Sequence, residues 1–442
     1  MTSLAAENRR VWGLIALITL LAILFVPFSQ FALGVRYTYT LRIVSLGGAL
    51  LGIVSGVLGC FAILRQQSLM GDALSHAALP GVGIAFLLAG RELGVLLIGA
   101  GIASWLGVQF IRAVTRTTRI KQDAAMGIVL ASWFAAGIAL LAYIQGRSDA
   151  SQAGLDSFIF GQAAAIVEGD IQLIAGVGLA SFVILAAFWK EFKLITFDPQ
   201  FASANGFRVA ILDTLLSTLI VVAIVLGLQL AGVILMVGML IAPGIAARQW
   251  TNKLNQMIIL AAVFGAFAGG TGAIVSAIDT DVPTGPMIII VAFSLVLVSI
   301  AFAPGRGLLW SWLRAQRDRR RFAAQTMLRH LYRYATQHGG PDAPVPCEFV
   351  LGVGGSAATI GLEQLRQRGY ADGDDQSWQL TSMGIEAAQE DAHNQSLWDT
   401  YRQYSDELNL PMVREDRQED NHSLLPGEAV QKLEQKLEGP QI

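Results

Sequence analysis

The run IVSLGGALLGIVSGVLGCFAIL at positions 43–64 contains no charged side chain over 22 residues. A helix needs about 20 consecutive apolar residues to cross a bilayer, so this run predicts a membrane span. Gly48, Gly52 and Gly56 recur in it at every fourth residue, which leaves a groove where another helix backbone can approach closely. Gly265 and Gly269 repeat this spacing later in the chain. The pattern indicates close helix packing, either within the chain or at a subunit interface.

Other apolar runs surround this one, near 11–28, 74–90, 94–111, 124–144, 171–189, 209–228, 230–247, 256–278 and 286–303. The runs 74–90 and 230–247 contain Gly and Pro, which is typical of broken or re-entrant segments. Eight to ten membrane crossings are therefore expected. Arg9 and Arg10 precede the first run, but no small-residue cleavage site follows it, so we expect an uncleaved span rather than a signal peptide.

The composition separates two parts of the chain. With 54% hydrophobic residues and a mean hydropathy of +0.53, the sequence excludes a disordered chain, a disulfide scaffold and a single soluble domain. Residues 1–303 carry 29 of the 64 charged side chains and the shorter remainder carries 35. We expect an all-α polytopic membrane domain at 1–307, a basic juxtamembrane helix or linker at 308–333, and a cytoplasmic α+β domain at 334–442. Cys60, in an apolar run, is expected to be a small buried side chain.

The basic residues predict the orientation in the membrane. Loops between the apolar runs contain clusters of Lys and Arg at 112–121, 190–208 and 248–253, and 306–321 follows the last run. If all ten runs cross, every one of these clusters lies on the side of the N-terminus. The opposite loops, 145–170 and 279–285, carry one basic residue and six acidic residues. Because basic loops stay in the cytoplasm, both termini are predicted to be cytoplasmic.

The stretch LMGDALSHAALPG at 69–81 places ionisable side chains next to an apolar span. Such groups are costly in a membrane and commonly functional. Asp72 and His76 are four residues apart, so they share one face of a helix. A carboxylate with an imidazole suits a divalent ion such as Mn²⁺, Fe²⁺ or Zn²⁺, and two ligands make a site that an ion can leave. The alternative is an Asp–His hydrogen bond that closes a helix end.

The stretch FDPQFASANG at 197–206 predicts a short, well-capped helix between two spans. Asp198 is a favourable N-cap, Pro199 suits the first helical position, and Gly206 suits the residue after the helix end. A short helix in a cytoplasmic loop is what a membrane subunit would offer to a docked partner. The alternative is a structural connector.

Five stretches, in this order, resemble the permease subunits of ABC-3 family metal-ion importers. They are LMGDALSHAALPG at 69–81, RIKQDAAMGI at 119–128, FDPQFASANG at 197–206, MVGMLIAPGIAAR at 236–248 and DVPTGPMIIIVA at 281–292. The resemblance covers about residues 40–307. It implies a pore that carries Mn²⁺, Zn²⁺ or Fe²⁺ across the plasma (inner) membrane of a bacterium. It also implies that Asp72 and His76 line the ion pathway. It also implies a coupling helix that docks on the ATPase and contains Asp198, Pro199, Gln200, Phe201, Ala202 and Gly206.

The resemblance further implies partners. These are cytoplasmic ABC ATPase subunits, an extracytoplasmic metal-binding protein, and a second permease, either a copy or a homologue. No lysine in the chain follows a glycine, so the phosphate-binding GK pattern of a P-loop is absent and ATP hydrolysis is expected in the partner. Asp279 and Asp281 are candidates for an outer mouth that attracts cations, or they mark a polar loop. The soft side chains of Met236 and Met239 are expected to pack against lipid or in the core rather than bind metal.

The C-terminal part begins with a basic segment. Seven arginines and one acid lie in 311–333, a pattern that favours contact with anionic membrane lipid. The balance then reverses, with 7 basic and 19 acidic residues in 334–442. Residues 346–384 read as helix, turn, helix and hairpin, which resembles the winged-helix domain of DtxR/MntR-type metalloregulators. Gly355–Gly369 would be the recognition helix. The stretch from Gly384 to Gly439 resembles the helical metal-sensing and dimerisation part of the same class.

The similarity departs from the family pattern at the metal ligands. Gln395 stands where the family has a histidine, with His393 two residues away, and Asn421 stands at an expected carboxylate. A variant site could use His393, Glu419, Asp420 and His422. The acidic balance argues against nucleic-acid binding, which rests on basic residues.

We therefore expect a regulatory or docking domain, or alternatively a folded appendage that braces the complex. Two rival functions for the whole chain are a membrane-tethered metal-responsive regulator with little transport and a proton-coupled secondary transporter. Few acids within the spans weigh against the second rival.

Overall fold

The computed structural model describes residues 2–32, 34–90, 92–146, 161, 166–279, 282–304, 306–408, 410 and 425–438. The chain divides into two compact units, Met1–Trp310 and Ser311–Ile442. Each unit has its own hydrophobic core.

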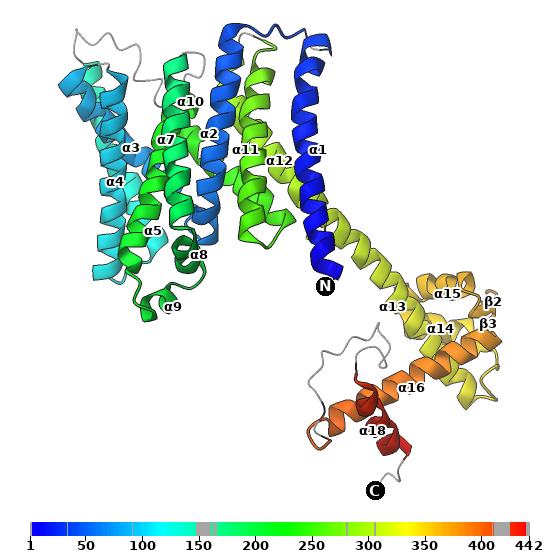
Figure 1. Ribbon diagram of the computed structural model, residues 1–442. Helices are drawn as coiled ribbons and strands as arrows, with labels where there is room; N and C mark the ends of the chain where they lie inside the picture. The colour runs from blue at the N-terminus through cyan, green and yellow to red at the C-terminus, as the bar shows by residue number, and fades with distance from the viewer. Residues whose placement is uncertain are drawn as a thin grey trace. The chain divides into compact units, whose positions relative to one another are not determined.

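The first unit is a bundle of helices (Figure 1). In chain order these are α1 (Thr2–Ala32), α2 (Tyr39–Leu64), α3 (Met70–Ala89), α4 (Leu93–Thr117), α5 (Gln122–Gln145), α7 (Glu168–Ala187), α8 (Trp189–Phe197), α9 (Pro199–Ala204), α10 (Val209–Trp250), α11 (Leu254–Ser276) and α12 (Thr284–Phe302). Within the described residues, nine segments are long and apolar enough to cross a membrane. This number falls in the predicted range of eight to ten.

The glycine seams of α2 and α11 pack against each other within the chain. A Cβ added to Gly48 would lie 2.7 Å from the carbonyl oxygen of Gly269, and one added to Gly56 would lie 2.6 Å from that of Ala261. The two backbones are therefore nearly in contact along several turns, and a side chain at these positions would separate them. This arrangement confirms the first of the two sequence interpretations, packing within one chain.

Helix α10 covers two of the predicted apolar runs as one 42-residue element with a break. At the break, Gly232 has φ 76° and ψ 169°, a conformation that only glycine adopts readily. Beyond it, Gly238 faces Ile289 and Phe293 of α12. Met236 and Met239 are fully buried, in the core rather than against lipid.

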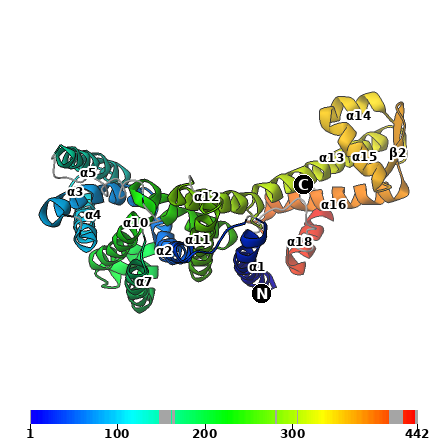
Figure 2. The ribbon, with the colours of Figure 1, turned by 90° about the horizontal axis from the view of Figure 1, so that it is seen from above.

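Helix α3 is continuous, although its sequence suggested an interrupted segment. Pro80 lies inside it, and Gly137 of α5 faces Leu79 and Pro80 so closely that a larger residue there would collide with them. On the other side, a Cβ at Gly81 would lie 2.1 Å from the carbonyl oxygen of Gly99 in α4. Figures 1 and 2 both show α3, α4 and α5 grouped together. Helix α3 thus remains continuous through Pro80, with close neighbours on α4 and α5.

The second unit combines helices with a small sheet. Its elements are the greater part of α13 (Leu308–Gln337), then β1 (Val345–Pro346), α14 (Cys347–Gly354), the 3₁₀ turn η2 (Gly355–Ala357), α15 (Ala358–Gln367), β2 (Ala371–Gly373), β3 (Ser377–Leu380), α16 (Ser382–Tyr404) and α18 (Gly427–Glu438). The sheet is antiparallel in the order β1-β3-β2. The predicted succession of helix, turn, helix and hairpin is present between 346 and 384.

Two clusters of buried side chains stabilise this unit. One joins Met327 and Leu331 of α13 to Leu362 of α15 and Trp378 of β3. The other joins Trp398 and Tyr401 of α16 to Val430 and Leu433 of α18. Between α13 and α16, Asp391 accepts hydrogen bonds from the guanidinium of Arg329, one of them at 3.0 Å, and these contacts raise the pKa of Arg329.

Candidate metal pathway and partner-docking helix

Asp72 and His76 lie together at the start of α3, as their spacing predicted. The Nε2 atom of His76 is 3.3 Å from Oδ1 of Asp72. The ring of His76 packs edge-on against Phe134 of α5, with 4.8 Å between the ring centroids. Its other nitrogen, Nδ1, is buried and has no hydrogen-bond partner in the described part of the chain. The pair thus offers a carboxylate oxygen and an imidazole nitrogen at one point.

These two ligands do not form a closed metal cage. Within the described ranges, no group of three or more His, Cys, Asp or Glu side chains gathers in a way that could hold an ion. Asp72 retains 35% of its side-chain exposure, so the carboxylate is open to solvent or to a neighbouring subunit. An ion that met this pair would keep much of its coordination shell as water and could leave again.

Two neighbours fix the position of this pair. Ser104 of α4 donates a hydrogen bond of 2.9 Å to the carbonyl oxygen of Leu74, which lies between Asp72 and His76 on α3. Gly71 faces Leu240 and Val237 of α10, and its Cβ position lies 3.0 Å from a methyl carbon of Leu240. Asp72 and His76 therefore project from a helix that is immobilised by α4 and α10.

The short helix predicted at 198–206 is present as α9. Asp198 accepts a 2.8 Å hydrogen bond from the backbone N–H of Phe201, and Pro199 occupies the first turn. Gly206 has φ +82°, the left-handed conformation expected just after a helix end. The side of α9 that faces the bundle is anchored by Ala202, which is fully buried.

Large aromatic side chains surround α9 on its exposed side. Phe197, Phe201 and Phe207 retain 55%, 57% and 41% of their exposure. Gln200 is also exposed. Three large apolar side chains are thus exposed on and beside this capped helix.

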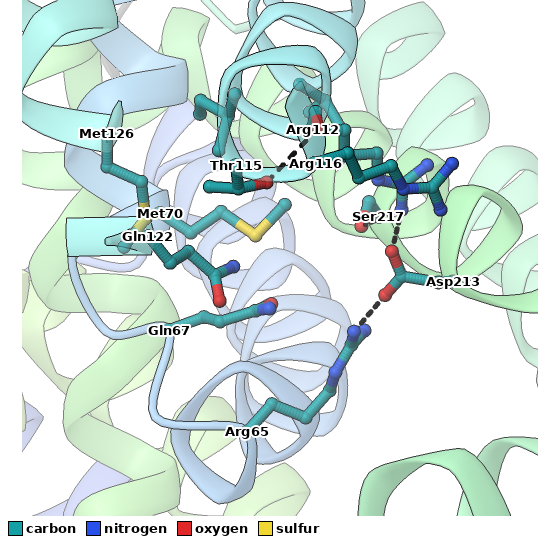
Figure 3. A pocket seen from close by; sticks show the side chains of 12 residues that line it. Arg65, Gln67, Met70, Arg112, Thr115, Arg116, Gln122, Met126, Asp213 and Ser217 are labelled. Carbon is teal, nitrogen blue, oxygen red and sulfur yellow. Dashed lines mark hydrogen bonds and ion pairs between the residues drawn. The ribbon is translucent and has the colours of Figure 1, made fainter. Parts of the chain in front are cut away.

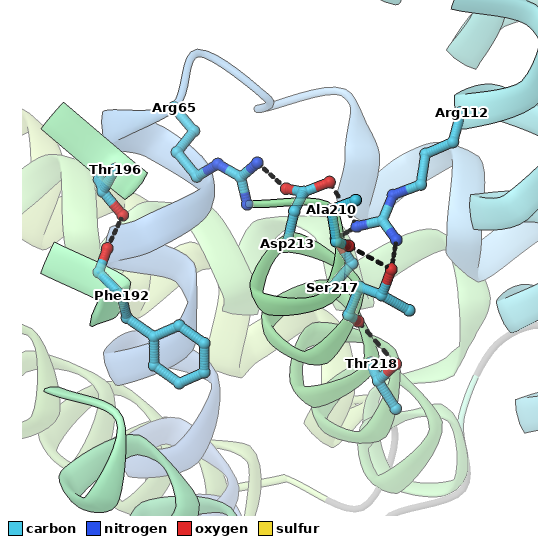
Figure 4. Close-up of polar contacts among 9 residues, drawn as sticks. Arg65, Arg112, Phe192, Thr196, Ala210, Asp213, Ser217 and Thr218 are labelled. Carbon is cyan, nitrogen blue, oxygen red and sulfur yellow. Dashed lines mark hydrogen bonds and ion pairs between the residues drawn. The ribbon is translucent and has the colours of Figure 1, made fainter. Parts of the chain in front are cut away.

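The structure also reveals an ion network that the sequence interpretation did not name. Asp213 of α10 bridges two arginines, Arg65 at the end of α2 and Arg112 of α4 (Figure 4). The Arg112 contact measures 2.6 Å, and Arg112 also donates to Ser217 at 3.0 Å. All three ionic side chains are less than 20% exposed. In the sequence, the position of Asp213 inside an apolar run was the feature that could have indicated this network. Its partners could not be identified, because they are far away in the sequence.

The remaining candidates are less well defined. His393 lies on α16, while Glu419, Asp420 and His422 lie outside the described residues. Asp279 follows α11, and Asp281 is also outside the described residues. The tail site and the outer mouth therefore stay predictions.

Comparison with known proteins assigns the chain to a family. The model of the ABC 3 transport family matches residues 37–303, which includes α2 to α12 almost completely. The chain belongs to this family. Both the Asp72–His76 pair and α9 lie within the matched part of this ABC 3 transport protein.

Named relatives cover different portions of this family member. It is 41% identical to the manganese transport system membrane protein MntC of Bacillus subtilis, over 88% of this chain and 89% of that protein. It is 46% identical to the zinc transport system membrane protein TroC of Treponema pallidum, over 63% of this chain and 94% of that one. The MntC alignment spans 392 residues, so it necessarily extends into the second unit.

A solved structure resembles the membrane bundle. The chain superposes on PsaBC from Streptococcus pneumoniae, in complex with Fab, with a TM-score of 0.55 and 34% sequence identity. The match covers 64% of this chain and 96% of that one. The fold of the first unit is therefore that of this transport family.

Proposed function

We propose that this chain is the membrane-spanning permease subunit of an ATP-driven importer of divalent transition-metal ions. Manganese is the favoured substrate, with zinc or iron as the other members of the class. The membership in the ABC 3 transport family supports this function, as do the names of the manganese and zinc relatives. The single observation that carries the proposal is the pairing of Asp72 with His76 inside the family's helical bundle.

The chemistry of this pair fits a transition-metal cargo. Mn²⁺, Fe²⁺ and Zn²⁺ accept mixed oxygen and nitrogen ligands, and a neutral imidazole nitrogen is a common metal ligand. We assign Asp72 the role of attracting the cation and His76 the role of selecting it over Mg²⁺ or Ca²⁺, which prefer oxygen ligands alone. Two protein ligands bind weakly enough to release the ion again, as conduction requires.

The energy for transport comes from partner ATPases that dock at α9. The exposed Phe201 would enter a groove on the ATPase, and the buried Ala202 would fix α9 to the bundle. ATP binding would move α9, and α9 would shift α10, the helix that follows it in the chain. We expect Asp198, Pro199 and Gly206 to preserve the shape of α9, and Gln200 to make polar contacts beside Phe201.

An extracytoplasmic metal-binding protein would deliver the ion at the opposite side. Asp279 and Asp281, which come between α11 and α12 in the sequence, would attract the cation there. A second permease, identical or homologous, would complete the pore. Both chain ends would then lie in the cytoplasm.

We assign the second unit a regulatory or docking role, with a fold of the winged-helix type. The antiparallel sheet order β1-β3-β2, with β1 before α14 and the β2–β3 hairpin after α15, supports this fold. DNA binding is not expected, because Arg366 on α15 is already engaged by the backbone oxygen of Gly373 and lies over the ring of Trp378. His393 with Glu419, Asp420 and His422 would form the sensing site if the unit binds metal.

The test is uptake of Mn²⁺, Zn²⁺ and Fe²⁺ into proteoliposomes that contain this chain with its ATPase. A catalytically dead ATPase is the control, and a chain lacking residues 323–442 tests the second unit. Accumulation of one metal that requires ATP hydrolysis is the expected result. An assembled complex that hydrolyses ATP but accumulates none of the three metals would contradict the proposed function.

A further inference from the structure

Two hollows of the first unit meet at the same pair of arginines, Arg112 and Arg116 near the end of α4. The first hollow is a polar cavity of about 160 Å³, lined by residues of α2 to α5 and α10 (Figure 3). The second is an open groove of about 650 Å³ between α4 and α10. Arg112 and Arg116 line both, so the polar cavity and the groove lie on either side of the same two arginine side chains.

The polar cavity carries an excess of positive charge. Arg65, Arg112 and Arg116 line it, with Asp213 as the acidic side chain among its lining residues. The two oxygens of Asp213 are engaged by Arg65 and Arg112, so they do not neutralise Arg116, which is exposed and forms no ion pair with a described side chain. One water molecule needs about 10–15 Å³ of such space, so a cavity of 160 Å³ has room for a phosphate group.

Unused hydrogen-bonding groups lie at the same cavity. The Nη1 atom of Arg65 and the Oε1 atom of Gln67 are buried without a hydrogen-bond partner in the described residues. Gln67 is only 7% exposed. Figure 3 shows the ends of Gln67 and Gln122 turned toward the space between them and the arginines. Buried polar groups without partners are rare in folded proteins, so a bound polar ligand would account for this arrangement.

The groove has the opposite character. Trp105 and Ile211 are 39% and 56% exposed along it, and Leu215 also lines it on the α10 side. The hydroxyls in the groove are occupied, because Thr214 and Thr218 each donate to the carbonyl oxygen one turn earlier on α10. The groove therefore presents mainly hydrocarbon, with a cationic group at one end.

A polar anion site beside an apolar groove is complementary to an amphiphilic molecule, which has a charged headgroup and a hydrocarbon chain. We propose that Arg112 and Arg116 bind the headgroup phosphate of an anionic phospholipid, and that one of its acyl chains lies in the groove between α4 and α10. The position agrees, since α4 is a candidate membrane span that ends at Thr117 and the basic loop that follows is predicted to be cytoplasmic. Basic pockets between helices at this level suit anionic headgroups.

A second copy of the permease is a poorer occupant of the groove. A two-fold interface brings the same patch of both subunits together, so an interface formed by this groove would bury Arg112 and Arg116 of both copies in one patch. Like charges that meet across an interface are unfavourable. An inorganic phosphate ion would use the arginines but would leave the apolar groove exposed.

The experiment is native mass spectrometry of the full-length chain with its ATPase, loaded with phosphatidylglycerol or with phosphatidylcholine. The test variant is Arg116→Gln and its matched control is Arg119→Gln, a basic residue three positions further on that lines neither hollow. We expect wild type and Arg119→Gln to retain phosphatidylglycerol about fivefold better than Arg116→Gln. Arg116→Lys should restore most of the retention, and phosphatidylcholine should be retained weakly by all of them.

Two further variants distinguish a phospholipid from the other two candidate occupants, a free phosphate ion and a second permease. Leu215→Trp fills the groove without changing charge and should also lower phosphatidylglycerol retention, which a site for free phosphate would not show. Ile211→Cys, in a Cys347→Ser background, should not form a disulfide with a second permease. Equal retention by Arg116→Gln and Arg119→Gln, full displacement of the lipid by inorganic phosphate, or an efficient disulfide cross-link between two Ile211→Cys permeases would each overturn the proposal.

Discussion

Gly52 of α2 and Gly265 of α11 approach so closely that a Cβ added at position 52 would lie 2.0 Å from the carbonyl oxygen of Gly265. The two helices can reach this distance only because neither carries a side chain there. The contact is reciprocal, because a Cβ on Gly265 would meet the oxygen of Gly52 at the same distance. This pair sets the spacing of the central helices of the bundle.

Gly52→Ala is therefore expected to destabilise the protein. The added methyl group must push α2 and α11 apart, and overpacking of this kind typically costs about 1–3 kcal/mol. Gly127→Ala on α5 is the matched control, since nothing lies within 4 Å of its Cβ position. Thermal unfolding of the purified chain in detergent should show a lower Tm for Gly52→Ala only. An unchanged Tm would mean that α2 and α11 separate without cost.

Asp72→Ala and His76→Ala are each expected to abolish metal uptake. Either change removes one of the two ligands that we assign to the pathway, and His76→Ala also removes the ring contact with Phe134. Asp123→Ala is the control, because Asp123 lies in the first turn of the neighbouring α5 and is exposed. Uptake in proteoliposomes and co-purification of the ATPase are the measurements. Normal uptake by either variant would remove that residue from the pathway.

Phe201→Ala is expected to weaken binding of the ATPase. Truncation of a central aromatic side chain at an interface commonly costs about 2 kcal/mol, or roughly thirtyfold in affinity. Phe31→Ala is a suitable control, because Phe31 on α1 is 91% exposed and lies far from α9 in the sequence. Quantitative pull-down of the ATPase would distinguish the two variants. Equal recovery of the ATPase with both would argue against docking at α9.

Asp213→Asn is expected to lower stability by about 3 kcal/mol, because it leaves the buried guanidiniums of Arg65 and Arg112 without their counter-charge. A second substitution tests the cause. In the Asp213→Asn background, Arg112→Gln should cost less than it does in the wild type, since one uncompensated charge is then removed. Chemical unfolding of the four proteins gives the coupling energy. Strictly additive effects would show that the three side chains do not act as a network.

Asp391→Asn is expected to loosen the second unit. Asp391 is 13% exposed and joins Arg329 of α13 to α16, and this contact raises the pKa of Arg329. Hydrogen exchange of α16 in the full-length chain should accelerate in this variant. Asp399→Asn should change exchange little, because its ion pair with Arg402 is largely exposed and such pairs contribute little. Identical exchange in both variants would count against a structural role for Asp391.

Features encoded by local spacing could be predicted from the sequence. The four-residue glycine spacing predicted the close packing of α2 and α11, and the i,i+4 spacing placed Asp72 beside His76. The cap at Asp198 follows from residue types alone, because capping depends on neighbours within one turn.

Features that depend on distant contacts could not be predicted in this way. Arg65 and Asp213 are 148 positions apart, so no pattern within one helix joins them. Pro80 suggested a break in α3, but the space left by Gly137 on α5 accommodates the proline and keeps the helix continuous. In the other run with Gly and Pro, 230–247, the expected interruption is present at Gly232, but no local pattern indicated that this run and 209–228 form one element, α10.

The break at Gly232 divides α10 into two helical segments that meet at one non-helical residue. The half before Gly232 carries Asp213 and with it the connections to α2 and α4, and the half after it packs through Gly238 on α12. An unbroken helix would pass a tilt at one end directly to the other. A break at a glycine leaves the two segments without a shared helical axis, so the docking that we propose for α9 could tilt the first segment while the second keeps its contact with α12. A residue with a Cβ at position 232 would be strained at φ 76°, so the geometry of both segments depends on this one glycine.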